Sequence, residues 1–410
     1  MTAALLLLFL LAPIARAQDV TVFDSDNFAR AFHPPSMEQA VSWSAAFYDV
    51  SHRALHRPWQ VALFDLIADV ILPVPLSDTW THEEFHRAVL ANRGVASFDD
   101  VYRFRVAPQS IAVSHVRDDK LAQMKREHPA DFVRAHAAGI EGEHALVLRL
   151  EKQHFFDGVT SWNGPLYWLV KVNTIAYIAS GSSKDANSET EKWEREEGTH
   201  ISRRDFTGHD FTAWVYDLFR PNEPYAARGI HPSGVGIRRY IRESDLTDAE
   251  RSYLRRQGRL SLINLVDPNL FDFYGRRFNL TASHLLTPFG YSIDANVFLR
   301  NPKLFVTLHD YVNHERNLPG VDVTFGGGQR PSAVRTAEGG CPPLFRVALW
   351  RQPEHLQFRD RGGRLGGLVS TRVRRGKWFA EIEAKSAGWV EGNVHLDKSV
   401  SVRGGFYARP

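Results

Sequence analysis

The chain has 410 residues, of which 43% are hydrophobic and 24% are charged. This is the composition of a folded globular protein, and it excludes a chain that is disordered throughout. The 50 basic and 47 acidic residues give a net charge of +3, a balance that argues against nucleic acid as the main partner.

The N-terminal segment has the features of an export signal. An apolar stretch runs from Ala3 to Leu11, and Ala15 and Ala17 precede Gln18 as in a small-x-small cleavage site. The stretch is too short to span a bilayer, so we expect residues 1–17 to be a cleaved signal peptide. Because Cys341 is the only cysteine, no internal disulfide can form. We therefore expect a bacterial protein of the periplasm or outer membrane.

Helical patterns dominate residues 18–275. Residues 59–76 are apolar on a broad face until Pro73 and Pro75 end the run, because proline cannot continue a helix. Helices are also expected within 118–150, 163–180, 210–219 and 248–257. The range 18–275 is thus predicted to be a mainly helical domain.

Residues 78–93 carry the clearest helix prediction. Asp78 or Thr79 can accept hydrogen bonds from the first free backbone amides. His82 and His86 are four residues apart, so both rings project from one side and can bind one metal ion. Glu83 directly follows the first histidine, which places its carboxylate beside such a metal. From there it can take a proton from water that the metal has acidified.

The stretch His82-Glu83-Glu84-Phe85-His86 resembles the HExxH motif of zinc metallopeptidases. The resemblance implies a Zn²⁺ ion bound by His82 and His86, with Glu83 as the general base. The alternative is a charged surface helix in which Glu83 pairs with Arg87.

A catalytic zinc site needs a third protein ligand. Since no HxxGxxH extension follows, the resemblance narrows to the gluzincins, in which a glutamate on a later helix completes the site. Glu141 and Glu143 compete for this role. We favour Glu143 because it shares a helix face with apolar residues such as Val147, where a carboxylate is costly to bury unless a metal neutralises it.

Two further residues are catalytic candidates. His209 and Asp210 stand together in the stretch FTGHDFTAW. A histidine there can stabilise an oxyanion or orient another ligand. Asp210 is equally well placed to cap the helix that follows.

Other functions fit the same residues. Glu83 with His86 and Glu141 with His144 are both ExxH pairs, and Glu197 with His200 is a third. Two such pairs on facing helices bind two iron ions in carboxylate helix bundles. The lone glutamates that such bundles need on two further helices are not evident. A third hypothesis is a non-enzymatic outer-membrane pore or binding protein whose helices serve as a scaffold.

After about residue 276 the apolar period changes to two. From Ile293 to Leu299 every second residue is apolar, and similar segments follow to the C-terminus, separated by short turns. This predicts an antiparallel β-meander or barrel over 276–410. A meander would bury its apolar face on the helices and leave its polar face in water, whereas a barrel would direct apolar residues to lipid and polar residues to its lumen.

The sequence thus predicts an α+β protein, with a helical metallopeptidase-like domain followed by an antiparallel β-domain. The expected function is that of an exported zinc metallohydrolase that acts on peptides or proteins. The β-domain is the expected route of any association with the outer membrane.

Overall fold

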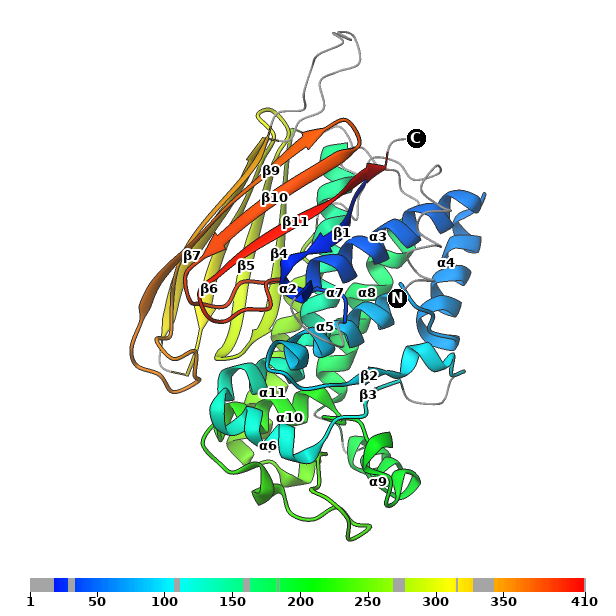
Figure 1. Cartoon of the computed structure of the whole chain (residues 1–410), viewed down its shortest axis with the longest axis vertical. Coiled ribbons are helices and arrows are strands. Elements are labelled where there is room, and N and C mark those ends of the chain that lie inside the picture. The colour runs from blue at the N-terminus through cyan, green and yellow to red at the C-terminus, as the bar shows by residue number, and fades with distance from the viewer. Residues whose placement is uncertain are drawn as a thin grey trace.

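The computed structural model describes residues 18–28, 34–106, 111–157, 163–181, 183, 185–267, 277–314, 316–326 and 343–408. The expected signal peptide over 1–17 lies outside these residues. Within them, a helical half precedes a nine-stranded antiparallel sheet (Figure 1), which confirms the predicted α+β class. None of the helices in this described part is long and apolar enough to cross a membrane.

The helical half contains ten α-helices among the described residues, joined by short 3-10 and π-helical turns. They are α2 (Ser25–Phe28), α3 (Met37–Ala54), α4 (Pro58–Leu66), α5 (Asp78–Asn92), α6 (Asp118–Glu127), α7 (Pro129–Asp157), α8 (Gly164–Ser180), α9 (Asp185–Glu197), α10 (Asp210–Phe219) and α11 (Asp248–Leu260). Two short strands, β2 (Phe98–Asp99) and β3 (Val113–Ser114), pair with each other.

Helix α7 is the longest helix and packs closely against α5. Phe85 of α5 and Phe132 of α7 belong to one buried apolar core. Two glycines of α7 allow the close approach. A Cβ atom on Gly139 would lie 2.1 Å from Nε2 of His82, and one on Gly142 would lie 2.9 Å from the Phe85 ring. The contact with α7 thereby fixes the position of the histidines on α5.

The large sheet consists of β1 (Gln18–Asp24), β4 (Phe278–Thr287), β5 (Gly290–Leu299), β6 (Leu304–Val312), β7 (Asn317–Gly326), β8 (Leu344–Gln352), β9 (Arg364–Arg375), β10 (Trp378–Lys385) and β11 (Ser399–Ala408). From β4 to β11 each strand pairs with the next one in the chain, as in the predicted meander. Strand β1 comes from the other end of the chain and pairs with β11. Consequently β1 and β4 are the edges of the described sheet.

The polar face of the sheet is the one that faces the helices. Asp294 and Asn296 of β5 and Thr307 of β6 are buried and line one pocket with His144 of α7, whereas Leu349 and Val369 are exposed on the other face. The orientation is therefore opposite to that expected for a meander. Period-two alternation shows that a strand has two different faces, but it does not show which face the helices cover.

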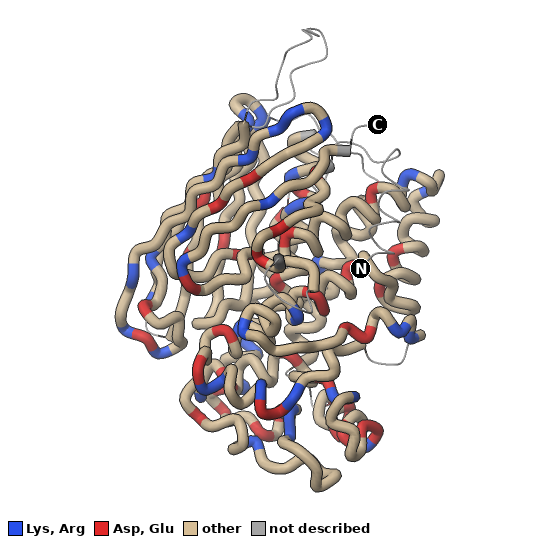
Figure 2. Tube along the Cα trace, viewed as in Figure 1, with Lys and Arg blue, Asp and Glu red and all other residues tan. Residues whose placement is uncertain are grey.

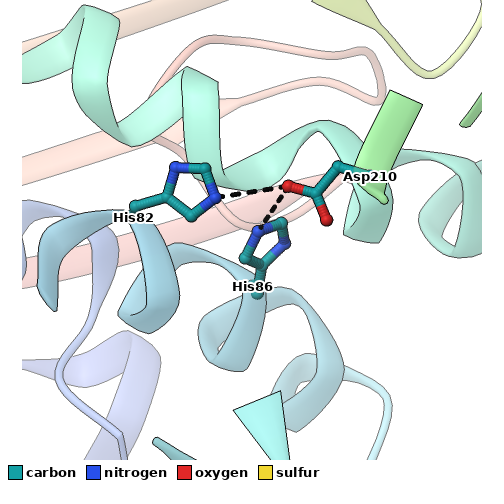
Figure 3. Close-up of side chains that lie close together, drawn as sticks. All are labelled: His82, His86 and Asp210. Carbon is teal, nitrogen blue, oxygen red and sulfur yellow. Dashed lines mark hydrogen bonds and ion pairs between the residues drawn. The ribbon is translucent and has the colours of Figure 1, made fainter. Parts of the chain in front are cut away.

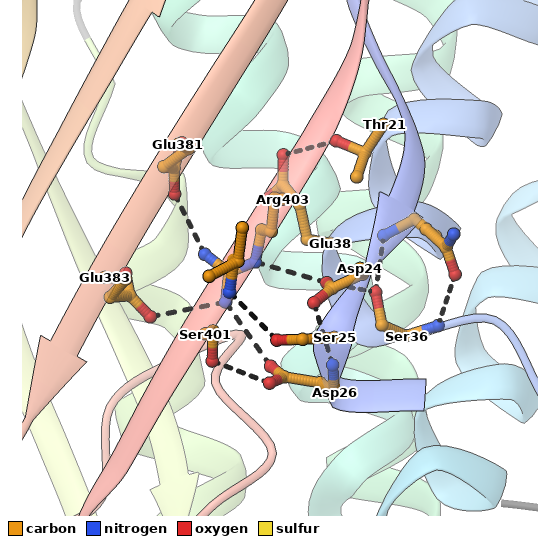
Figure 4. A network of polar contacts seen from close by, with 12 residues as sticks. Thr21, Asp24, Ser25, Asp26, Ser36, Glu38, Glu381, Glu383, Ser401 and Arg403 are labelled. Atoms are coloured by element: carbon orange, nitrogen blue, oxygen red, sulfur yellow. Dashed lines mark hydrogen bonds and ion pairs between the residues drawn. The ribbon is translucent and has the colours of Figure 1, made fainter. Parts of the chain in front are cut away.

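Arg403 of β11 illustrates how the polar face is stabilised (Figure 4). Its guanidinium donates hydrogen bonds to Glu381 at 2.9 Å, to Asp24 at 3.2 Å and to Glu383 at 3.3 Å. A buried charge is tolerated only when it is paired and hydrogen-bonded. This network satisfies Arg403 and joins β10 and β11 to the end of β1.

Candidate metal centre

Helix α5 carries both histidines of the predicted motif. It begins at Asp78, after Ser77, whose hydroxyl accepts a hydrogen bond from the backbone N–H of Trp80 at 3.3 Å. The cap is therefore one residue before the predicted Asp78 or Thr79. The predicted helix over 78–93 agrees with the observed helix to within one residue at its end. His82 and His86 are both buried, with ring centroids 4.8 Å apart.

The two histidines converge on the carboxylate of Asp210 (Figure 3). Oδ2 of Asp210 lies 3.2 Å from Nε2 of His82 and 3.3 Å from Nε2 of His86. Asp210 is the first residue of α10, where the helix dipole favours a negative charge. One potential ligand atom from each residue lies within 4.8 Å of the other two. This buried group can hold a metal ion.

The second nitrogen of each ring has its own partner. Nδ1 of His86 donates to the backbone carbonyl of Ala135 at 2.5 Å, and Nδ1 of His82 lies 2.8 Å from Oε1 of Glu143. A carbonyl can only accept, so this contact places the proton of a neutral His86 ring on Nδ1 and the lone pair on Nε2. Partners of this kind orient the histidine ligands of metal sites.

Glu143 and Asp210 occupy positions in the site that differ from the predicted ones. Glu143, the predicted third ligand, lies on the Nδ1 side of His82, where Thr174 and Asn173 also donate hydrogen bonds to it. Asp210, predicted to be catalytic, is the carboxylate that meets both Nε2 atoms. The difference lies in the nitrogen that each carboxylate meets: Glu143 contacts Nδ1 of His82, whereas Asp210 contacts Nε2 of both rings. Glu143 is therefore placed to orient a ligand, and Asp210 to be one.

The charges of the group depend on one another. Although burial opposes it, His86 and His82 hold the pKa of Asp210 well below its usual range. Burial also opposes protonation of His82, yet hydrogen bonds with Asp210 and Glu143 raise the pKa of its ring well above normal. Without a metal, His82 thus carries the positive charge that the two carboxylates require. A bound cation would take over this role.

The group borders a cavity of about 150 Å³. Acidic side chains outnumber arginines five to two among the residues that line it: Glu83, Asp100, Glu197, Asp205 and Asp210 against Arg105 and Arg203. Burial raises the pKa of Glu83 to about 8. Oδ1 of Asp205 is buried and has no hydrogen-bond partner among the described residues. A cavity wall with more carboxylates than arginines, and with one carboxylate oxygen that lacks a hydrogen-bond partner among the described residues, is suited to bind a cation.

His209 precedes Asp210 but has other contacts. Its ring packs on Trp193 with centroids 4.7 Å apart, and its Nε2 lies 3.5 Å from Glu189. His209 is not among the described residues that line the cavity. Its backbone carbonyl accepts the first bond of α10. Its observed contacts are therefore structural.

The second ExxH pair of the di-iron hypothesis lies elsewhere. Glu141 forms a buried ion pair with Arg134 at 2.6 Å, and Nδ1 of His144 contacts Glu391 at 2.5 Å. Neither side chain belongs to the group around Asp210. The first two ExxH pairs therefore do not share one site. Of the third pair, Glu197 lines the cavity beside His82 and His86, but His200 is not among the described residues that line it.

Tyr177 and Asp205 line the cavity but were not singled out by the sequence. Burial, together with Asp210, Glu83 and Asp205, raises the pKa of Tyr177 well above its usual value. Tyr177 lies on the helix predicted over 163–180, whose apolar character hid a functional candidate. Asp205 stands only five residues before Asp210, and this closeness in sequence was a usable signal. Comparisons with protein-family models, curated proteins and solved structures found no match to the chain.

Proposed function

We propose that this protein is a zinc-dependent hydrolase that cleaves peptide bonds. The observation that carries the proposal is the convergence of His82, His86 and Asp210 at a cavity that also contains Glu83. Two imidazole nitrogens and one carboxylate oxygen form a typical ligand set of catalytic zinc, which leaves a fourth position open. The HExxH spacing of His82, Glu83 and His86 supports zinc over other divalent metals.

A zinc ion at this group would polarise a carbonyl and make water a stronger acid. Glu83 is the residue placed to receive the proton, because it lines the same cavity and is adjacent to His82. Its pKa of about 8 belongs to the metal-free protein, and a nearby cation favours the ionised carboxylate. Ionised Glu83 can then accept a proton from water and pass it to the leaving amine.

Tyr177 is the proposed donor to the substrate. Its hydroxyl stays protonated because burial and the adjacent carboxylates oppose ionisation. A phenol at the cavity wall can donate a hydrogen bond to the oxygen on which negative charge develops. The rings of Trp193, Phe206 and Tyr240 also line the cavity, which favours an apolar side chain next to the scissile bond.

The test is proteolysis by the purified full chain, with casein and a fluorogenic peptide library as probes. We expect cleavage that stops on chelation and returns with zinc. Glu83→Gln should retain zinc but lose at least about a hundredfold in rate, since general-base catalysis contributes roughly 10²–10⁴. Glu189→Gln, which changes an exposed carboxylate on α9, is the matched control. Cleavage that persists in Glu83→Gln, or that chelators leave unchanged, would overturn the proposal.

A further inference from the structure

The outward face of the large sheet carries an apolar region that extends across eight strands. Three rows of paired residues cross it from β4 towards β11, and we call them together the outer apolar band. The rows are Phe278, Leu299, Leu304, Phe325, Phe345, Thr371, Ile382 and Val402; then Leu280, Val297, Val306, Val323, Val347, Val369, Ala384 and Val400; then Ala282, Ala295, Leu308, Val321, Leu349 and Gly367. The band contains no charged residue, and Thr371 is its only polar one.

The band is exposed in the described structure. Leu349, Val369 and Val400 keep 60%, 57% and 65% of their surface accessible. With strands about 4.8 Å apart and rows about 7 Å apart, the band covers on the order of 500 Å² between backbone positions alone. Contiguous apolar patches of this size on a protein surface mark sites that bind a partner or a membrane. The helices lie mainly on the polar face and reach the band side only near the end of β4, where Gln257 of α11 contacts His284, so most of the band stays uncovered.

One margin of the band has the composition of a lipid headgroup boundary. Phe278, Phe325, Phe345 and Trp378 are all exposed and lie at the same end of their strands. Basic residues stand in the adjoining turns, and Figure 2 shows them at the hairpin between β9 and β10, which carries Arg375 and Lys377. Aromatic rings followed by lysine and arginine are characteristic of the interface between acyl chains and headgroups.

The helical half hydrogen-bonds part of each edge of the described sheet. At β1, the N–H of Thr21 donates to Ser42 at 3.2 Å and its carbonyl accepts from the indole of Trp43 at 2.7 Å. At β4, the N–H of His284 donates to the side chain of Asn264 at 2.6 Å. Lipid offers no hydrogen bonds to a backbone, so these contacts suit a sheet next to acyl chains. They also hinder pairing with the edge of a second copy.

We propose that the outer apolar band contacts the acyl chains of a lipid bilayer, with Trp378 and the adjoining basic residues at the headgroups. Figure 1 shows the sheet curving around the helices, so its outward face is convex. Two convex faces from two copies would touch only over a narrow strip, whereas fluid lipid can follow the curvature. Anionic headgroups match the basic margin. The metal centre would then lie in the helical half, away from the lipid-facing surface.

The test is flotation of the purified full chain with vesicles made of equal parts phosphatidylcholine and phosphatidylglycerol. The double variant Leu349→Glu with Val369→Glu places two charges in the band. The matched control is Val172→Glu with Leu262→Glu, two exposed apolar residues of the helical half with 54% and 53% of their surface accessible. We expect the wild type and the control to float, and the band variant to lose at least about tenfold in bound fraction.

A second measurement does not depend on introducing charges. Acyl chains that carry bromine should quench the emission of the wild type more than that of Trp378→Phe, because Trp378 would lie at the bilayer boundary. The proposal is overturned if the wild type does not float, if the band variant floats equally well, or if quenching is the same in Trp378→Phe. A dimer of the wild type would also overturn it, if sedimentation shows that the band variant is a monomer and the wild type does not float with vesicles.

Discussion

His82 and Glu143 are 61 residues apart in the sequence, and a hydrogen bond of 2.8 Å joins Nδ1 of the first to Oε1 of the second. Orienting partners of this kind typically change metal affinity by ten- to a hundredfold. We therefore expect Glu143→Gln to weaken zinc binding by about that factor, as measured by competition with a chromogenic chelator. Thr174→Val, which removes a donor to Glu143 and the bond of the same hydroxyl to the Val170 carbonyl, should have a smaller effect in the same direction.

Glu141→Gln is the control for this prediction. Glu141 is also a buried carboxylate of α7, but it pairs with the buried Arg134 at 2.6 Å. Removing one partner of a buried pair costs about 3–5 kcal/mol, so denaturant unfolding should show a loss of that order in the free energy of unfolding. Zinc affinity of the folded protein should be unchanged. If Glu141→Gln and Glu143→Gln weakened zinc binding equally, Glu143 would have no specific role.

Gly139→Ala tests the close approach of α7 to the metal centre. The added Cβ would lie 2.1 Å from Nε2 of His82, so the ring must leave its present position, in which that nitrogen lies 3.2 Å from Asp210. We expect zinc affinity to fall at least about tenfold, although alanine favours the helix more than glycine does. Gly142→Ala is the matched control, because its Cβ meets the Phe85 ring at 2.9 Å and should lower stability without lowering zinc affinity. The prediction fails if Gly139→Ala binds zinc like the wild type.

Asp69 gives a prediction about pH. Its Oδ1 accepts hydrogen bonds from the hydroxyl of Tyr48 and from the N–H of Asp78 at the start of α5. Burial raises the pKa of Asp69 to about 7, against about 3.9 in an unfolded chain. Between these values the folded state holds a proton that the unfolded state has released. This group therefore lowers the free energy of unfolding as pH rises from about 4 to about 7.

Asp69→Asn removes that ionisation. We expect the stability of the variant relative to the wild type to increase from about pH 4 to about pH 7 and to remain constant at higher pH. Urea unfolding at several pH values measures this difference. A difference that is independent of pH, or that decreases as pH rises, would show that Asp69 is ionised in the folded protein.

Local patterns were sufficient to predict the elements themselves. Helix α5 was predicted over 78–93 and spans Asp78–Asn92, and the change of period near residue 276 precedes β4 at Phe278. Both predictions rest on residues close in sequence. Strand β1 was not predicted, because its seven residues form a strand by pairing with β11 at the opposite end of the chain.

The spacing of residues in the sequence could not identify the carboxylate that contacts both histidines. Asp210 is 128 residues after His82, and its position depends on how α10 packs beside α5 and α7. Glu143 was preferred because it lies on an apolar helix face and must be neutralised there. In the structure Glu143 is buried next to His82, and its partners are the His82 ring and the hydrogen-bond donors Thr174 and Asn173.

The alternation of polar and apolar residues along the strands likewise did not reveal which face of the sheet the helices cover. Polar residues such as Asp294 face the helices, and apolar residues such as Val369 face outward. A burial rule for soluble sheets predicts the opposite. The polar groups are satisfied within the protein by contacts such as that of His309 with Asp294 at 2.9 Å, which explains how a polar interface between sheet and helices can be stable.

The most direct test of the proposed zinc centre is the metal content of the purified full chain by elemental analysis, with three variants beside it. We predict one zinc ion per chain in the wild type and in His144→Ala, whose ring contacts Glu391 instead of the centre. We predict loss of zinc in His82→Ala and in Asp210→Asn. Two iron ions per chain, lost in His144→Ala and retained in His82→Ala, would contradict the zinc centre.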